Sequence, residues 1–296
     1  MRHDAPFRHS LPVPDGLFRA PLYVTGAGWE RIMPGQSYPR PDAAMYGFRW
    51  EDGRVLPEFC LSLLTQGSGH LETQAGGQEI PERRAFLFRP GEWHRHRPAR
   101  ASGWTNHWIH FNGDLPHEWM RDGAFELDGN LPIIEDAELF HGQFMRLLLT
   151  VERAPTTNTR ALACQAVGLI SHFLLHTAPL RDECLHHEDD LINRAVEFIW
   201  NHSHVSVGVP EVASHVGCVR RTLERRFAAV LGRSVLDEIQ LCRLTRAKWL
   251  LEETALPLKQ ILSRAGLRER RQLWLLFKKH LAMSPDAYRR SVQPGA

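Results

Sequence analysis

Hydrophobic and polar positions follow two different periods along the chain, and the change falls near Asp136. Before it, short runs rich in β-branched and aromatic residues partly alternate with polar ones, and glycines and a Pro-Gly pair separate the runs. This pattern is typical of strands joined by turns. The clearest predicted strand segments are residues 22–29, 59–74, 85–90 and 103–111. Many short strands with regular turns predict an antiparallel barrel or jelly roll, which can hold one small ligand at its mouth.

After Asp136, apolar residues recur every three or four positions and predict two helices separated by Pro155. The apolar positions of the two helices are Leu139, Phe140, Phe144, Leu147, Leu148 and Val151, then Leu162, Cys164, Val167, Ile170, Phe173 and Leu174. An apolar stripe of this kind must be buried. The stripe packs either on the barrel or on a second copy of the chain, and the pattern favours neither.

The C-terminal region carries the pattern of a helix-turn-helix. Pro210 suits the first turn of a helix, Val212 and Val216 lie on one face, and Gly217 ends it. A second helix follows at once from Arg220. Two helices joined by a tight glycine turn form this DNA-binding motif.

A rotation of about 100° per residue gives the second helix two distinct faces. Leu223, Phe227 and Val230 are predicted to face the core, and Arg221 and Arg225 to point away from it. An outward arginine can bond a guanine through two hydrogen bonds in the major groove. Thr222 and Glu224 flank this outward face, whereas Arg220 and Arg226 are predicted nearer the core edges, beside phosphates or internal carboxylates.

The same unit then repeats. Val212, Gly217, Leu223 and Phe227 correspond to Ile261, Gly266, Leu273 and Phe277, at offsets of 49 or 50 residues. Two copies of one supersecondary unit are therefore predicted. Ser234 with Asp237 is typical of a cap that starts a connecting helix running toward Glu253. One rigid connecting helix would let both units enter successive major grooves, which recur at about 34–36 Å.

Charge distinguishes the helix-turn-helix region from the rest of the chain. The 296 residues have a net charge of only +2, but residues 190–296 hold 18 Lys+Arg against 10 Asp+Glu, and residues 1–189 hold 18 against 24. A basic module beside an acidic one indicates a partner that is a polyanion. Between them, the polar segment 177–190 contains Pro179 and is predicted to be a linker.

Other classes of protein are disfavoured by composition. The five cysteines form no C-x-x-C pair, which favours free thiols in a reducing cytosol. No apolar run approaches the roughly 18 residues of a membrane span, and the N-terminus lacks a signal-peptide core. We expect a cytoplasmic protein with no membrane association.

Residues 190–290 resemble the DNA-binding domain of the AraC/XylS transcription regulators. The stretches that carry the resemblance are VPEVASHVGCVRRTLERRFAAVLGRS, RLTRAKWLLEETALPLKQIL and FKKHLAMSPDAYRR. The front half is more weakly similar to the sugar-sensing, cupin-like domain of arabinose-responsive members, through RPGEWHRHR and WTNHWIHF. The resemblance implies a ligand-responsive homodimer that binds double-stranded operator DNA and controls an operon, in some members by contact with RNA polymerase.

The resemblance also implies site residues. Ligand-lining positions match His96, Asn106 and Trp108, and we add the neighbouring His94. An N-terminal arm, here about residues 1–18, can fold over the pocket. Base contacts match Arg221, Glu224 and Arg225. The full predicted DNA-binding set is Arg220, Arg221, Thr222, Glu224, Arg225, Arg268, Arg270, Arg271, Gln272 and Leu275.

The chain departs from the family pattern at several of these positions. Val219 stands where the family usually has a capping Ser, and loss of a cap typically costs about 1 kcal/mol. Leu275 stands where the family often has Arg, so it could contact a thymine methyl group. We mainly expect phosphate contacts from Arg270 and Arg271 and fewer base contacts from this second unit.

A metal site is not expected. His94 and His96 form H-x-H, and His107 and His110 lie on the next strand segment, but no carboxylate follows H-x-H as in metal-binding cupins. The nearby tryptophans Trp93, Trp104 and Trp108 suit a sugar-like ligand, although each alone also fits an ordinary barrel core. No cofactor is expected.

The predicted fold class is α+β with two domains. The predicted parts are an arm (1–18), a cupin-like sensor (19–135), a helical dimerisation segment (136–178), a linker (179–189) and a DNA-binding domain with two helix-turn-helix units (190–296). The expected function is a ligand-responsive transcription regulator of a carbohydrate or small-metabolite operon, not an enzyme. Two alternatives are a metal-dependent cupin enzyme fused to a DNA-binding module and a DNA-repair protein, which would need clustered cysteines.

Overall fold

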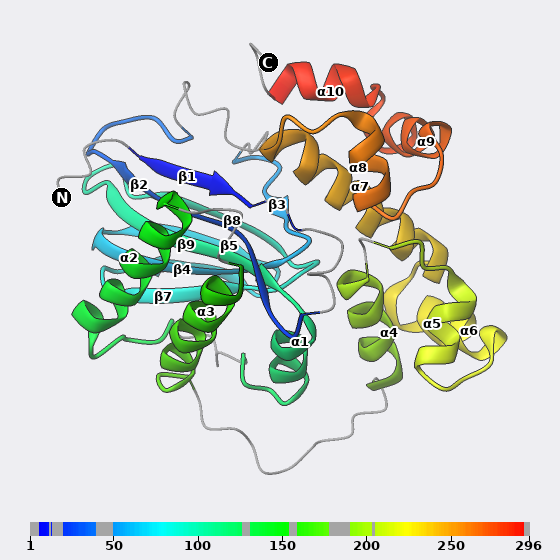
Figure 1. Ribbon diagram of the computed structural model, residues 1–296, viewed down its shortest axis with the longest axis horizontal. Helices are drawn as coiled ribbons and strands as arrows, with labels where there is room; N and C mark the ends of the chain where they lie inside the picture. The colour runs from blue at the N-terminus through cyan, green and yellow to red at the C-terminus, as the bar shows by residue number, and fades with distance from the viewer. Residues whose placement is uncertain are drawn as a thin grey trace. The chain divides into compact units, whose positions relative to one another are not determined.

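The computed structural model describes residues 6–11, 13, 20–39, 50–125, 131–153, 159–177, 190–202 and 205–292. The chain divides into two compact units, one built from residues up to 182 and the other essentially from residues 183–296 (Figure 1). The predicted linker, 179–189, and much of the predicted arm lie outside the described residues.

The N-terminal unit contains two antiparallel β-sheets. Its strands are β1 (Phe7–Ser10), β2 (Tyr23–Ile32), β3 (Arg54–Val55), β4 (Phe59–Gly67), β5 (Gly69–Thr73), β6 (Gly76–Ile80), β7 (Arg84–Phe88), β8 (Trp93–Pro98) and β9 (Trp104–Asn112). They form a five-stranded sheet in the order β1-β2-β9-β4-β7 and a four-stranded sheet in the order β3-β8-β5-β6. The described strand pairs are antiparallel. The predicted fold class is confirmed.

The two faces of the five-stranded sheet have different partners, because side chains alternate along each strand. On β9, Ile109 and Phe111 join a core shared with the helices that follow the barrel. Trp108 and His110 alternate with these residues along the strand, so their side chains point the other way, toward the space between the two sheets. The β1 strand, formed by part of the predicted arm, pairs with β2 at the edge of this sheet.

Two helices, α2 (Ala137–Arg153) and α3 (Thr159–Leu174), cover the outer face of the five-stranded sheet (Figure 1). Most of the predicted apolar stripe is buried in this contact. Leu139 and Cys164 are exceptions to the prediction, since both are exposed. The barrel therefore covers the stripe. The short helix α1 (Asp114–Arg121), which the sequence pattern did not predict, follows β9 directly.

The described part of the C-terminal unit is helical. Its helices are α4 (Asp190–Asn201), α5 (Val209–His215), α6 (Arg220–Leu231), α7 (Val235–Glu253), α8 (Leu258–Arg264), α9 (Arg270–Leu281) and α10 (Pro285–Val292). The Ser234 hydroxyl accepts a hydrogen bond from the Asp237 amide at 3.1 Å, so the predicted cap of the connecting helix α7 is confirmed. Among the described helices, none is long and apolar enough to cross a membrane.

Backbone geometry confirms the predicted repeat. Gly217 and Gly266, which join the two helices of each unit, have φ of 71° and 65°. Each second helix then ends in a left-handed residue, Gly232 after α6 and Ala282 after α9. Two further hydrogen bonds hold the helices together, because Trp200 donates to the buried Glu238 at 2.7 Å and Tyr288 donates to Glu252.

Candidate nucleic-acid interface and ligand site

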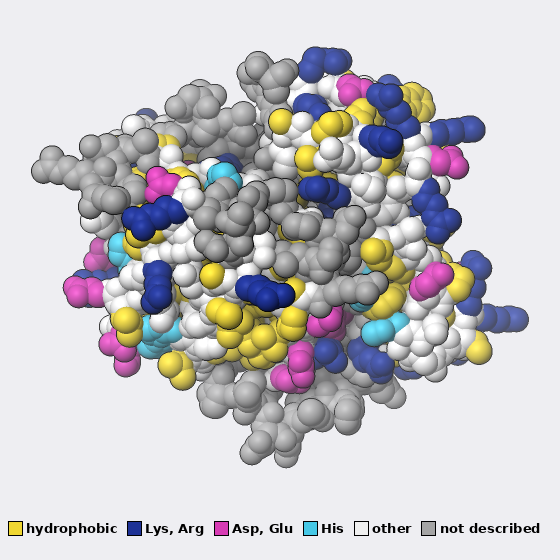
Figure 2. Space-filling view, in the orientation of Figure 1, with side chains coloured by type: hydrophobic (Ala, Val, Ile, Leu, Met, Phe, Trp, Pro, Cys, Tyr) yellow, Lys and Arg dark blue, Asp and Glu magenta, His cyan; other side chains and the backbone are white. Residues whose placement is uncertain are grey.

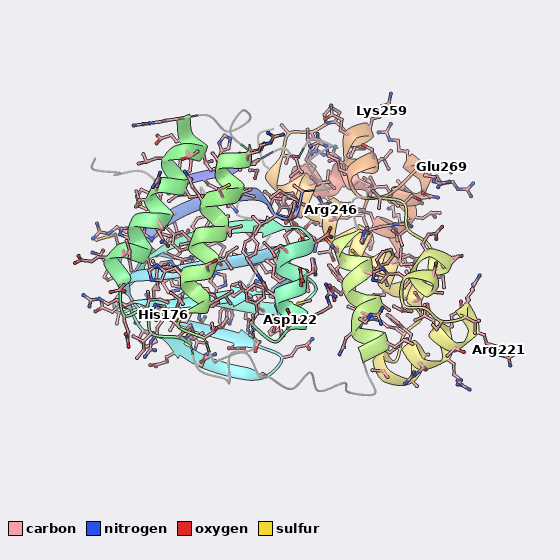
Figure 3. The ribbon with its side chains drawn as sticks, turned by 60° about the horizontal axis from the view of Figure 1, so that its bottom comes forward. Asp122, His176, Arg221, Arg246, Lys259 and Glu269 are labelled. Carbon is pink, nitrogen blue, oxygen red and sulfur yellow. The ribbon has the colours of Figure 1, made fainter. Side chains whose placement is uncertain are left out.

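The first recognition helix, α6, presents its arginines to solvent. Leu223 and Phe227 are fully buried against α4, α5 and α7, which fixes the rotation of the helix. Arg221 and Arg225 are consequently exposed on the opposite side. Figure 3 shows Arg221 extending away from the helix. Both guanidinium groups are thus available to a base edge or a phosphate.

One prediction about α6 was wrong. Val230 is 48% exposed, because the last turn of the helix projects past the core that Phe227 enters. Arg220 meets an internal carboxylate as predicted, although it is exposed, since its Nε donates a hydrogen bond to Glu224 at 2.8 Å. This ion pair joins two residues that lie one helical turn apart, and it holds the Glu224 carboxylate beside Arg220. Thr222, between them in the sequence, is half-buried.

The second recognition helix, α9, is oriented by the equivalent pair Leu273 and Phe277, both fully buried. Its predicted contact residues are exposed. Arg270 lies 3.7 Å from Asp286, and the side-chain oxygen of Gln272 accepts a hydrogen bond from the Arg268 amide at 3.2 Å. Arg271 and Leu275 are both exposed to solvent, as predicted from the rotation per residue of a helix.

One helix, α7, packs against both recognition helices, α6 and α9 (Figure 1). Lys and Arg side chains gather along the edge of this unit in Figure 2. Neither recognition helix has a side-chain cap at its N-cap residue, Val219 or Glu269. The first backbone N–H groups of each helix are therefore available to phosphate oxygens, which commonly bind at helix N-termini.

The four predicted ligand-binding residues all lie in the interior of the N-terminal unit. His94 and His96 come from β8 and Asn106 and Trp108 from β9, and each side chain is buried. The two strands belong to opposite sheets. The His96 ring lies 5.6 Å from the Trp104 ring across this interior.

The Trp108 indole packs against β2 at Gly28, which has no side chain. A Cβ atom added to Gly28, its partner on β2, would lie 2.6 Å from the indole. On the next strand, β1, the Arg8 guanidinium lies 5.9 Å from the centre of the Trp108 ring. Sequence reasoning missed Arg8, although it belongs to the arm that the family resemblance placed near the pocket.

His94 is held by the protein at both ring nitrogens. Arg54 donates from Nε to His94 Nε2 at 3.1 Å, and His94 Nδ1 lies 3.1 Å from the Glu92 carbonyl oxygen. This pattern requires the neutral tautomer with the proton on Nδ1. The Phe88 ring also stacks on His94 at 3.6 Å. His94 therefore forms part of the wall and orients Arg54, a residue whose only sequence signal is its place after the Asp52-Gly53 turn.

Burial keeps the interior histidines neutral. Burial first, and then the Arg54 charge, lower the pKa of His96 well below its usual range. The same causes, with Arg8, lower the pKa of His110 to about 3. Nearby, Asn106 Oδ1, Trp104 Nε1 and His110 Nδ1 are buried and make no hydrogen bond within the described structure.

Buried polar atoms normally have partners, because an unmade hydrogen bond costs about 1–3 kcal/mol. Neutral imidazoles, an amide and an indole N–H offer both donors and acceptors, which matches the hydroxyl groups of a polar ligand. Among the described residues, no group of three or more His, Cys, Asp or Glu side chains is placed to hold a metal ion.

Two family models match the two units. Residues 34–168 match the AraC-like ligand binding domain, and residues 212–291 match a helix-turn-helix domain. The chain belongs to the AraC family of transcription regulators. It therefore has a ligand-binding and a DNA-binding domain.

Relatives of known role agree with this assignment. The chain is 27% identical over 237 residues to the arabinose operon regulatory protein of Escherichia coli K12, covering 78% of this chain and 80% of that protein. It is 30% identical over 101 residues to the xylose operon regulatory protein of the same strain, covering 34% of this chain and 26% of that protein. A solved structure of the C-terminal domain of AraT from Geobacillus stearothermophilus is 29% identical, covers 34% of this chain and 85% of that one, and has a TM-score of 0.34. The first two relatives are named as operon regulatory proteins.

Proposed function

We propose that this AraC-family regulator binds a sugar in the interior of its N-terminal unit and controls a carbohydrate operon. The observation that carries the proposal is the set of buried polar atoms without partners around Trp104 and Asn106, near the half-buried Arg8, whose guanidinium lies 5.9 Å from the centre of the Trp108 ring. Relatives named for arabinose and xylose operons support a sugar over other polar metabolites. The role is binding and not catalysis.

A thermal-shift screen of free sugars on the full chain tests the effector. A true ligand at 100 times its dissociation constant should stabilise the protein by about 2.7 kcal/mol. The same sugar should give no shift in Asn106→Leu, which removes the amide oxygen from the interior. A chain stabilised by no sugar would contradict the proposed effector class.

We propose that α6 reads bases through Arg221 and Arg225, with Glu224 beside them, and that Arg270 and Arg271 of α9 bind phosphates. Their exposure and the single helix joining both units support this arrangement. The logarithm of the binding constant should fall linearly with the logarithm of salt concentration, by about 0.9 per neutralised phosphate. Arg271→Ala should reduce that slope by about one without changing sequence preference.

We also propose that the protein acts as a homodimer, with RNA polymerase as a further partner. The helices α2 and α3 leave one side uncovered after packing on the barrel, which supports their use between two copies. Molar mass from light scattering tests this proposal. A monomer at micromolar concentration, with and without operator DNA, would contradict it.

A further inference from the structure

The second recognition helix carries large apolar side chains at two outward positions where the first carries charged ones. Helices α6 and α9 have the same length of 12 residues, follow a positive-φ glycine and end in a left-handed residue. An offset of 50 residues therefore superimposes their faces, and it brings the buried Leu223 onto the buried Leu273. The outward matches are Arg221 with Arg271, Glu224 with Trp274, and Arg225 with Leu275.

Both replacements exchange a charged side chain for a large apolar one. Trp274 is 46% exposed and Leu275 is 49% exposed, so neither contributes fully to the core. The Lys278 ammonium lies 5.5 Å from the centre of the Trp274 ring, one helical turn further on. This cation–π contact holds the indole along the helix surface. Trp274 and Leu275 together form an apolar ridge on a rigid element.

Cations flank the apolar ridge. The same helix exposes Arg270, Arg271, Lys278 and Lys279. Arg270 lies 3.7 Å from Asp286, and Lys279 lies 3.6 Å from Asp237. A partner that matches this surface must present apolar groups between two rows of negative charge. The major groove of duplex DNA does so, because the thymine C5-methyl group is its apolar feature and phosphates line both edges.

We propose that Trp274 and Leu275 read thymine methyl groups in the major groove, so that the second unit recognises T-containing steps by apolar contact. The neighbouring cations bind the phosphates on either side. The inference rests on the proposed function, since it requires that α9 face DNA as α6 does. It assigns a specificity role to Trp274, which sequence reasoning did not single out.

Deoxyuridine tests the inference, because it differs from thymidine only by the missing C5-methyl group. The full chain is first used to select its preferred sequence from a pool of random duplexes. Each thymidine of the half-site distal to the Arg225-dependent bases is then replaced by deoxyuridine, one at a time. We expect about fourfold weaker binding for each contacted methyl group. Trp274→Ala and Leu275→Ala should bind the thymidine duplex more weakly and lose this sensitivity.

Leu139→Ala is the matched control, since Leu139 is an exposed leucine on a helix of the other unit, and it should retain full deoxyuridine sensitivity. Unchanged affinity on every deoxyuridine duplex would overturn the inference. So would variants that keep their DNA affinity but lose transcriptional activation, because the apolar ridge would then contact a protein. An unsubstituted chain with no preferred sequence would contradict the proposed function itself, and this inference with it.

Discussion

The interior of the sensor and the outer face of the recognition helices use polar side chains in opposite ways. In the interior, Asn106, His96 and His110 are sealed from water, and the two histidines are kept neutral by burial and by nearby guanidinium groups. On α6, Arg221 and Arg225 stay exposed and charged. The first arrangement costs stability wherever a buried polar atom lacks a partner, whereas the second costs little and acts at long range.

The largest expected effect is that acid pH destabilises the sensor interior, where the histidines are buried, and not the exposed face of the recognition helices. The pKa values of His107 and His110 are lowered to about 3, chiefly by burial, whereas an unfolded histidine titrates near 6.5. The unfolded chain therefore binds more protons between these values, so stability is complete above pH 6.5 and falls as the pH drops toward 3. The loss should reach about 1.4 kcal/mol per pH unit for each histidine.

Urea unfolding between pH 7.5 and 5 measures this slope. His110→Asn should flatten it, and His280→Asn, on the exposed side of α9, should leave it unchanged. A stability that does not depend on pH in the parent chain would mean that the interior histidines are not sealed from water.

Arg225→Ala should cost about 1–3 kcal/mol of discrimination at one base pair, because it removes a two-bond contact to a base. Affinity for the selected duplex should fall and preference at that position should relax. Arg160→Ala removes an exposed arginine from α3 and serves as the charge-matched control. Equal affinity and preference in Arg225→Ala and the parent would show that α6 is docked differently.

Gly28→Ala should destabilise the protein by about 1–3 kcal/mol, since the new Cβ meets the Trp108 ring at 2.6 Å and the Phe7 carbonyl at 2.7 Å. Displacement of Trp108 should also weaken the effector-induced thermal shift. Gly168→Ala is the control, because a Cβ at that position on α3 meets nothing within 4 Å. It should stabilise the helix by up to about 1 kcal/mol. Equal stability changes in the two variants would contradict the placement of Trp108.

The smallest expected change in stability concerns the backbone of the residue that ends each recognition helix. Ala282 ends α9 with φ of 57°, where the first unit has Gly232. Glycine adopts this conformation without strain, so Ala282→Gly should stabilise the chain by about 0.5–1 kcal/mol and Gly232→Ala should destabilise it similarly. Calorimetry on both variants measures the pair. Two changes of the same sign would contradict the equivalence of the units.

The buried and exposed faces of the recognition helices were largely predictable from the sequence. The spacing of residues along a helix determines which side of the helix each residue occupies. Leu223 and Phe227 fixed the inward side, and Arg221 and Arg225 followed. The error arose at the C-terminal end of α6, where Val230 extends beyond the core.

The sensor interior was predictable only in part. The strand segments and the residues on β8 and β9 followed from alternation and from the family resemblance. Arg8 and Arg54 did not, because they come from β1 and β3, and only long-range strand pairing brings them beside Trp108 and His94. The need for glycine at position 28 is likewise visible only with Trp108 opposite.

The central claim is that exposed arginines on rigid, repeated helices give sequence-specific DNA binding. The direct measurement is the affinity of the full chain for its selected duplex relative to a scrambled duplex of equal length and base composition, at one physiological salt concentration. We predict a ratio of at least about 10³, as for specific regulators. Equal affinity for both duplexes would reduce the interface to a basic surface and contradict the claim.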